Sequence, residues 1–351
     1  MSKDLFPKLS ERAGVCYDYY STDTRPTDYP LHYLSPEIWF YDYNYSPHIH
    51  KPNGTASSTL YPLPNQYQTI YNVKNANTVT VGNIAGLYPG KKWLLGNEPD
   101  VASQSNNTPT EYALGYKNLY NAIKAKDPTS MIYVGGIGSM SQARMAWLGE
   151  VTTAYQSNCG SALPCDGWHV HGYIVEEIPG APGINHPVGL AGSVTVRGGT
   201  AWADHTNKNV FKSDVKRMRQ WMKDKGYQNK PLIISEYGCL LPSLGWGKTP
   251  EVQGQFVKDT FDFMLYEKDT LGCPLDNNKL VQEFALFSAN YDGFPDGRLF
   301  GVDKKITKLG KTYRKYWYSN FFDVALGKED EKDLYTESGS LMQTNTNIFG
   351  E

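Results

Sequence analysis

The chain has 351 residues, of which 40% are hydrophobic and 20% charged, so it can bury a large core and is not disordered. A net charge of −2 without a long basic run argues against nucleic acid as a partner. No apolar stretch approaches the roughly 20 residues that span a bilayer, so we expect no membrane segment.

Segments typical of strands and of helices alternate along most of the chain, which is the pattern of parallel βα units. The expected strands are residues 14–17, 38–43, 59–63, 92–95, 131–135, 167–171, 232–235 and 283–288. The expected helices are residues 110–126, 142–155, 212–225, 250–267 and 310–321. Eight strands with helices between them predict an α/β fold, a (β/α)8 TIM barrel of about 250 residues plus insertions.

We expect one domain over residues 1–351, with the barrel at about 14–321 and no boundary to a second domain. The longest irregular insertion, residues 174–209, follows the sixth strand. Long loops in compact domains are often functional, and this loop leaves the face of the barrel that carries active sites. We therefore predict a lid that faces the substrate. The tail, residues 327–351, is charged and polar and is expected at the surface or in partial disorder.

The cysteines and the N-terminus leave the compartment open. Cys159 and Cys165 are close enough in sequence for a small disulfide ring in an oxidising compartment. Cys16 and Cys239 lie in or just after expected strands, so we predict buried thiols. Residues 1–12 lack the apolar core of a signal peptide, so the protein is either intracellular or secreted with its leader already removed. We expect a monomer.

The fourth expected strand ends on a glutamate. Residues 93–95 are apolar and lead into Asn97, Glu98 and Pro99. A carboxylate at the end of an apolar strand is costly to desolvate unless the protein uses it. Pro99 keeps Glu98 away from helical geometry, and the apolar approach favours a raised pKa, as a general acid needs. A helix-capping acid is the alternative.

The seventh expected strand also ends on a glutamate. Residues 232–235 lead into Glu236, and Gly238 permits a tight exit. Such an apolar run is typical of a strand buried on both faces, and its glutamate, if ionised, is suited to nucleophilic attack. An ion pair inside the barrel is the alternative. Paired carboxylates are what glycosidic bond cleavage requires, so two converging glutamates predict a glycoside hydrolase.

Asn97-Glu98-Pro99 and Glu236 together resemble the signature of glycoside hydrolase clan A, a group of retaining enzymes on (β/α)8 barrels. Residues 95–100, with 104–106, further resemble the glycosyl hydrolase catalytic core group that contains family 128, whose known members cleave β-1,3-glucan. The resemblance implies that Glu98 is the acid/base, Glu236 the nucleophile and Asn97 the residue that holds the sugar 2-hydroxyl. It implies a carbohydrate substrate and no cofactor or metal.

The sixth expected strand places His169, His171 and Tyr173 on one face by alternation. The resemblance implies that Tyr173 hydrogen-bonds Glu236 and that His171 lines the pocket; a buried core histidine is the alternative for His171. Two departures leave the substrate open. Residues 39–44 lack the arginine that many clan members have on the second strand, and the eighth strand ends without tryptophan, with only Phe287 or Tyr291 as aromatic candidates.

Four aromatic residues in loops after strands are candidates for stacking on sugar rings, with core packing as the alternative for each. They are Trp202, Trp246, and Tyr43 or Tyr45. In contrast, Trp93 and Trp168 are expected in the core.

We predict a retaining glycosidase that cleaves an internal bond of a β-linked polysaccharide, first of all β-1,3-glucan, with β-1,4-glucan, mannan or xylan as alternatives. A metal-dependent barrel hydrolase is a second hypothesis, because His48 and His50, like His169 and His171, form His-x-His pairs. A non-catalytic carbohydrate-binding barrel is the third. Retention requires the two carboxyl groups to lie roughly 5–5.5 Å apart.

Overall fold

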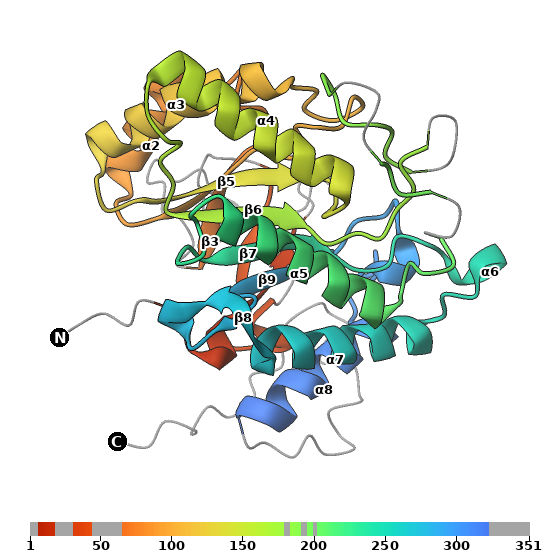
Figure 1. The fold of residues 1–351 in the computed structure, drawn as a ribbon. Helices are drawn as coiled ribbons and strands as arrows, with labels where there is room; N and C mark the ends of the chain where they lie inside the picture. The colour runs from red at the N-terminus through yellow and green to blue at the C-terminus, as the bar shows by residue number, and fades with distance from the viewer. Residues whose placement is uncertain are drawn as a thin grey trace, which may run out of the picture.

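A computed structural model describes residues 6–17, 31–43, 65–178, 183–190, 195–198 and 202–322. Within them, parallel strands close into a barrel in the order β1-β2-β3-β4-β5-β6-β7-β9, which confirms the predicted (β/α)8 architecture. Figure 1 shows the long helices around the outside of this barrel. The barrel strands are β1 (Ala13–Cys16), β2 (Trp39–Tyr41), β3 (Gln66–Ile70), β4 (Lys92–Leu95), β5 (Met131–Ile137), β6 (Gly167–His171), β7 (Leu232–Tyr237) and β9 (Glu283–Phe287).

The helices form a layer in which α2 packs against α3, α3 against α4, and α7 against α8. Strand β8 (Lys268–Cys273) lies outside the barrel sheet and forms antiparallel bridges to Lys279. The helices are α1 (Leu31–Leu34), α2 (Thr78–Leu87), α3 (Pro109–Lys126), α4 (Gln142–Cys159), α5 (Lys208–Asp224), α6 (Ser243–Trp246), α7 (Pro250–Tyr266) and α8 (Lys308–Phe321).

Side chains alternate along each strand, so every strand supplies both the barrel interior and the layer beneath the helices. Trp39, Leu94 and Ile233 belong to the interior cluster. Trp93 and Trp168 lie in the layer between strands and helices and are fully buried, as expected of core residues. Burial on both sides explains why β4 and β7 have continuous apolar sequences.

Helix α3 shows how local sequence defines an element. Thr108 and Glu111 form a capping box, in which the side chain of each accepts the backbone N–H of the other. Pro109 occupies the first turn, where its missing N–H costs no helical hydrogen bond. Tyr112 and Tyr116 belong to the buried face of the helix. The observed helix begins one residue before the predicted start at residue 110.

The third βα unit is the one that the sequence pattern located incorrectly. The third barrel strand is Gln66–Ile70, whereas residues 59–63, predicted for this place, lie outside the described residues. Gln66 and Gln68 are buried but polar, so this strand does not stand out as an apolar run. Helix α2, which follows, was not predicted because it mixes β-branched residues and glycines without a clear apolar stripe.

All five cysteines are free thiols, so the disulfide considered for Cys159 and Cys165 is not formed. Cys159 is half-buried and Cys165 is buried, at the end of α4 and before β6. Cys16 and Cys239 are buried, as predicted.

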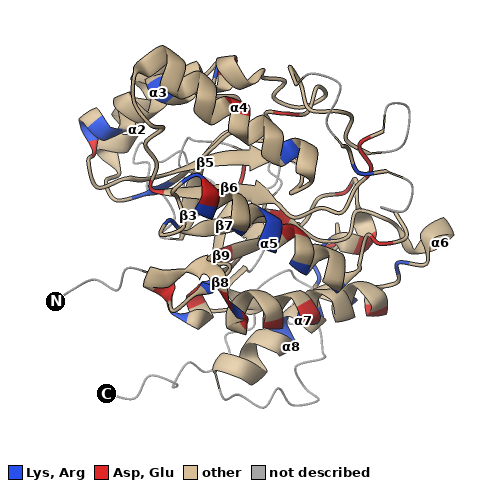
Figure 2. Cartoon of the chain, in the orientation of Figure 1, with Lys and Arg blue, Asp and Glu red and all other residues tan. Residues whose placement is uncertain are grey.

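Charged residues lie mainly on the outer helices and loops, whereas β5 and β6 carry none (Figure 2). This distribution agrees with a barrel whose strands are buried under helices. In the part of the chain that the structure describes, no helix is both long and apolar enough to cross a membrane. The predicted tail, residues 327–351, lies outside that part.

Candidate active site

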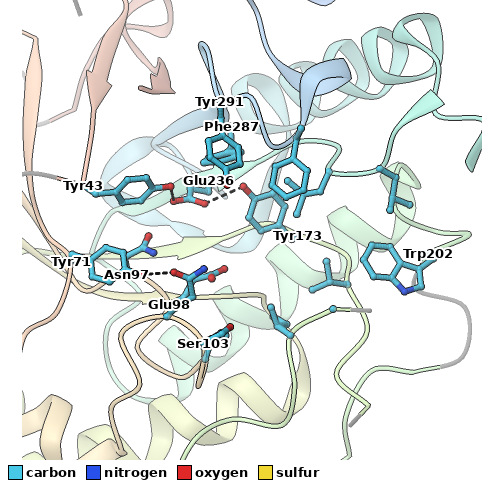
Figure 3. A pocket seen from close by; sticks show the side chains of 18 residues that line it. Tyr43, Tyr71, Asn97, Glu98, Ser103, Tyr173, Trp202, Glu236, Phe287 and Tyr291 are labelled. Atoms are coloured by element: carbon cyan, nitrogen blue, oxygen red, sulfur yellow. Dashed lines mark hydrogen bonds between the residues drawn. The ribbon is translucent and has the colours of Figure 1, made fainter. Parts of the chain in front are cut away.

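A pocket of about 590 Å³ opens at the C-terminal ends of the barrel strands, the face that carries the functional loops of such barrels. Glu98 and Glu236 lie in its middle, with Tyr43 and Tyr71 at one end and Trp202 at the other (Figure 3). The pocket is lined by Tyr43, Tyr71, Asn97, Glu98, Val101, Ser103, Gln104, Tyr173, Val175, Gly183, Ile184, Trp202, Glu236, Leu240, Leu241, Phe287, Tyr291 and Phe294.

Glu98 lies in a tight turn after β4 that holds it at the rim of the barrel. Its φ of 42° falls in the left-handed region, which residues other than glycine seldom adopt. Its backbone N–H donates to the carbonyl of Gly136 at 2.7 Å, and its carbonyl accepts the N–H of Val101 at 3.0 Å. A Cβ at Gly136 would lie 2.1 Å from the carbonyl oxygen of Gly96, so this position requires glycine. The turn therefore fixes the backbone of Glu98 against β5.

Glu236 lies within β7, and three tyrosine hydroxyls donate hydrogen bonds to its carboxylate. Tyr41 and Tyr43 both donate to Oε1, at 2.8 and 3.0 Å. Tyr173 donates to Oε2 at 3.1 Å, the contact that the resemblance implies (Figure 3). Tyr41 ends β2 and Tyr43 follows two positions later, so alternation places both side chains on one face.

His171 joins the two carboxylates. Its Nδ1 lies 3.3 Å from Oε1 of Glu98 and 3.4 Å from Oε2 of Glu236. These two oxygens are therefore separated by at most the sum of the two distances, 6.7 Å. The prediction that His171 lines the pocket is wrong: it is 1% exposed and is absent from the lining. It is the last residue of β6, so its ring stays inside the barrel, whereas Tyr173 reaches the rim.

Glu98, Glu236 and His171 are buried close together, so each charge affects the pKa values of its neighbours. Burial raises the pKa of Glu236 above its usual 4.5; His171 and the hydrogen bonds from Tyr41 and Tyr43 oppose this rise, and Glu98 adds to it. Burial by itself would lower the pKa of His171, but the charge of Glu236 and the hydrogen bond to Glu98 outweigh it and raise the pKa above 6.5. The two carboxylates thus shift the protonation equilibrium of His171 towards its charged form.

The three tyrosines that contact Glu236 remain hydrogen-bond donors. Burial, followed by the nearby negative groups, raises the pKa values of Tyr41, Tyr43 and Tyr173 well above 10.0. Their hydroxyls therefore stay protonated at neutral pH and supply three donors to one carboxylate.

A buried ion cluster lies beside the turn that carries Glu98. Arg144 of α4 contacts Oδ2 of Asp100 through Nη1 at 2.6 Å and Oε1 of Glu177 through Nε at 2.9 Å, and none of the three side chains is exposed. Nη2 of Arg144 also donates to the carbonyl of Asn185 at 2.5 Å. Burial raises the pKa of Asp100, and the charge of Arg144 opposes the rise. Arg144 thus ties the loop after β4 to the insertion after β6.

The described parts of the insertion form one wall of the pocket. Val175, Gly183, Ile184 and Trp202 all face the pocket from this segment. The insertion therefore lies where a substrate-facing segment was predicted, while its opening and closing as a lid stays a prediction.

Of the four aromatic residues predicted to stack on sugar rings, two line the pocket and one does not, and the fourth lies outside the described residues. Tyr43 and Trp202 line the pocket, and Asn97 lies beside Glu98 in the same lining. Trp246 does not line it: this side chain is 46% exposed and packs against Trp202, with 5.8 Å between ring centroids. Trp246 lies in α6, a short helix after β7 that was not predicted from the sequence. Tyr45 lies outside the described residues.

Of the imidazoles considered as metal ligands, His169 and His171 have other contacts. His169 lies near Ser235, with 3.1 Å between Nδ1 and Oγ, and burial lowers its pKa to about 3. Among the described residues, no group of three or more His, Cys, Asp and Glu side chains is arranged to hold a metal ion. His48 and His50 lie outside those residues.

Several pocket residues were missed in the sequence. Tyr41 had a detectable signal, since alternation over residues 39–43 places it on the same face as Tyr43. Tyr71 directly follows β3, whose position was not predicted. Leu240 and Phe294 lie in loops after β7 and β9, whose paths depend on tertiary packing. Phe287 and Tyr291, the two aromatic candidates at the end of the eighth barrel strand, both line the pocket.

A family model described as "Glycosyl hydrolase catalytic core" matches residues 14–179. The matched segment includes Asn97, Glu98 and His171 and ends before Glu236. This match, over just under half of the chain, agrees with the resemblance based on Asn97-Glu98-Pro99. No curated protein matches the chain.

Solved structures of similar fold include three GH128 endo-β-1,3-glucanases. A subgroup II endo-β-1,3-glucanase from Sorangium cellulosum is 18% identical, with 87% of this chain and 98% of that chain covered and a TM-score of 0.55. A subgroup II endo-β-1,3-glucanase from Pseudomonas viridiflava is 20% identical, with 86% and 96% covered and a TM-score of 0.57. A mutant subgroup I endo-β-1,3-glucanase from Amycolatopsis mediterranei, in complex with laminarihexaose, is 15% identical, with 87% and 99% covered and a TM-score of 0.54. At these identities the likeness establishes the barrel fold.

Proposed function

We propose that the protein is a retaining glycoside hydrolase that cleaves internal bonds of β-1,3-glucan. The observation that carries the proposal is the contact of His171 Nδ1 with both Glu98 and Glu236, which limits their contacting oxygens to a separation of 6.7 Å. Retaining enzymes hold their carboxyl groups about 5–5.5 Å apart and inverting enzymes about 6.5–9.5 Å. The limit is compatible with the retaining distance and supports it for these two oxygens.

The mechanism is a double displacement. Glu236 attacks the anomeric carbon, the bond from that carbon to the leaving oxygen breaks, and Glu98 donates its proton to that oxygen. Glu98, now ionised, takes a proton from a water molecule whose oxygen attacks the same carbon, and the ester to Glu236 breaks. Two inversions retain the anomeric configuration. Asn97, next to Glu98 in the lining, holds the sugar 2-hydroxyl.

The two sides of the pocket suit a carbohydrate chain. Gln104 and Ser103 offer polar contacts near Glu98, whereas Phe287, Tyr291 and Phe294 offer apolar faces. Sugar rings have polar edges and apolar faces, so both kinds of surface are used. The pocket continues on both sides of the carboxylates (Figure 3), as cleavage within a chain requires, and Tyr43 and Trp202 serve as stacking platforms at its two ends.

The enzymes of similar fold support the linkage. Three of them are endo-β-1,3-glucanases, and one of these binds laminarihexaose. We further propose that residues 1–351 form a single catalytic domain that acts as a monomer without cofactor or metal, which size-exclusion chromatography and metal analysis of the active protein would test.

The proposal is tested with a panel of polysaccharides, with the products followed by proton NMR from the first minutes. We expect oligosaccharides of several lengths from β-1,3-glucan, with the β anomer formed first. Initial release of the α anomer would show inversion. Turnover of β-1,4-glucan, mannan or xylan alone would reject the linkage, and binding of glucan without turnover would indicate a non-catalytic barrel.

A further inference from the structure

Glu236 is held asymmetrically by its hydrogen-bond donors. Oε1 accepts two hydrogen bonds, from Tyr41 at 2.8 Å and Tyr43 at 3.0 Å. Oε2 accepts one, from Tyr173 at 3.1 Å. An ionised carboxylate offers about two lone-pair sites on each oxygen, so both sites of Oε1 are occupied and one of Oε2 remains. The oxygen with the remaining lone pair is also the one that lies 3.4 Å from Nδ1 of His171, the nitrogen shared with Glu98.

The orientation of Tyr43 is itself fixed. The thiol of Cys16, at the end of β1, donates to the Tyr43 hydroxyl oxygen at 3.6 Å. A hydroxyl that accepts from one side still has its own proton to donate on another, and here that proton faces Glu236. The ring of Tyr43 also meets that of Tyr41 edge to face, with 6.1 Å between centroids. The pair from β2 is thus a packed unit.

We propose that Tyr41 and Tyr43 are positioning residues that hold Oε1 of Glu236, so that the nucleophile attacks through Oε2. The inference rests on the proposed retaining mechanism. In the first step the bond from Oε2 to the anomeric carbon forms and the bond to the leaving oxygen breaks, with the proton supplied by Glu98. Oε1 becomes the carbonyl oxygen of the ester and keeps both hydrogen bonds. In the second step water oxygen replaces Oε2, and the carboxylate leaves with its charge shared by Oε1.

The tyrosine pair acts differently on the two steps. Donors stabilise the carboxylate when it is fully charged, which is before the first step and after the second. They therefore make Glu236 a weaker nucleophile and a better leaving group. Removing them should leave formation of the ester intact or faster and should slow its hydrolysis. A role limited to packing would slow both steps alike.

The pH dependence is set by the groups that face Glu236. They are Glu98 after β4, His171 at the end of β6 and Tyr173 after it, Tyr41 at the end of β2 and Tyr43 after it, Tyr71 after β3, and Cys16 through Tyr43. Because donors to a carboxylate favour its ionised form, loss of two of them should move the acidic limb of kcat/KM upward by about one pH unit or more.

The first test compares Tyr41→Phe, Tyr43→Phe and the double variant with the wild type on an activated dinitrophenyl β-laminaribioside. We expect a burst of dinitrophenolate close to one per enzyme in the double variant, ester hydrolysis slowed about tenfold or more, and the upward shift of the acidic limb. Tyr116→Phe is the matched control. It removes a buried hydroxyl that donates to the carbonyl of Pro164 at 2.7 Å, away from the pocket, and should change none of these readouts.

The second test is a structure of the wild type trapped with a 2-deoxy-2-fluoro glycoside. We expect the ester through the oxygen that faces Tyr173, with Tyr41 and Tyr43 still on the other oxygen. An ester through the oxygen held by Tyr41 and Tyr43 would overturn the inference, as would equal slowing of both steps with an unmoved acidic limb. A wild type that neither turns over nor forms an adduct would reject the proposed function itself, and the inference with it.

Discussion

Nε2 of His205 accepts the backbone N–H of Leu240 at 2.9 Å, which joins the insertion after β6 to the loop after β7. A ring nitrogen that accepts is unprotonated, so the proton of the neutral ring is on Nδ1, which donates to the carbonyl of Ile174 at 2.8 Å. Burial lowers the pKa of His205 to about 4. Because the folded-state pKa is depressed, the stability it contributes is present above about pH 6.5 and is lost as the pH falls towards 4.

We therefore expect His205→Gln to reduce the dependence of stability on pH. Glutamine can accept from Leu240 and donate to Ile174 without titrating. Between about pH 7 and pH 4.5 the wild type should lose about 2–3 kcal/mol more of its free energy of unfolding than the variant. Urea unfolding at the two pH values measures the difference. Parallel losses in both proteins would show that His205 does not titrate in the folded state as inferred.

Arg144 is expected to contribute strongly to the stability of the folded protein. Arg144→Met leaves Asp100 and Glu177 buried without their cation, which should cost about 3–5 kcal/mol in the free energy of unfolding. Arg144→Lys should recover little of this lost stability, because one ammonium group does not reproduce the forked contacts of a guanidinium. Denaturant unfolding measures both variants.

The control for Arg144 is an ion pair between two outer helices. Lys208 lies 3.1 Å from Asp259, and its side chain is 49% exposed. Lys208→Met should change the free energy of unfolding by at most about 1 kcal/mol. If Arg144→Met behaved like this surface variant, the buried cluster would not be a structural support of the pocket.

Glu236→Ala should lower turnover of every substrate by roughly 10⁴–10⁶-fold, because no ester can form. Azide should partly restore activity by entering the space of the lost carboxylate and should give a glycosyl azide of inverted configuration. Glu267→Ala, which removes a glutamate paired with Lys212 and Lys216 on the outside of the barrel, should leave turnover unchanged. A Glu236→Ala protein with near-normal activity would assign the nucleophile elsewhere.

Glu98→Ala should affect substrates according to their leaving group. Cleavage of unactivated glucan should fall by about 10²–10⁴-fold, since the departing oxygen needs a proton. Formation of the ester from a dinitrophenyl glycoside needs none and should be nearly unaffected, as rapid-quench measurements would reveal. Equal, mild losses on both substrates would count against Glu98 as the acid.

Local sequence was enough to predict the barrel and its two rim glutamates. The apolar approach to Glu98, the Asn97-Glu98-Pro99 turn and the buried run before Glu236 are all signals within a few residues of one another. Parallel strands place their carboxyl ends on one rim, so the convergence of two such ends in a single pocket follows from strand order. The capping box of α3 is equally local.

The contacts between residues from different strands depend on how the barrel closes, and the local sequence did not predict them. His171 meets both glutamates, Tyr41 joins Tyr43 on one oxygen, and Arg144 finds Glu177 because strand register, twist and loop path bring them together. The strand register is irregular between Gly135 and Ile137 and between Val170 and His171. Such irregularities change the directions in which the following side chains point, and the hydrophobic pattern of the sequence does not reveal where they occur. Sequence specifies which faces are buried, whereas distances between faces arise only when the whole barrel packs.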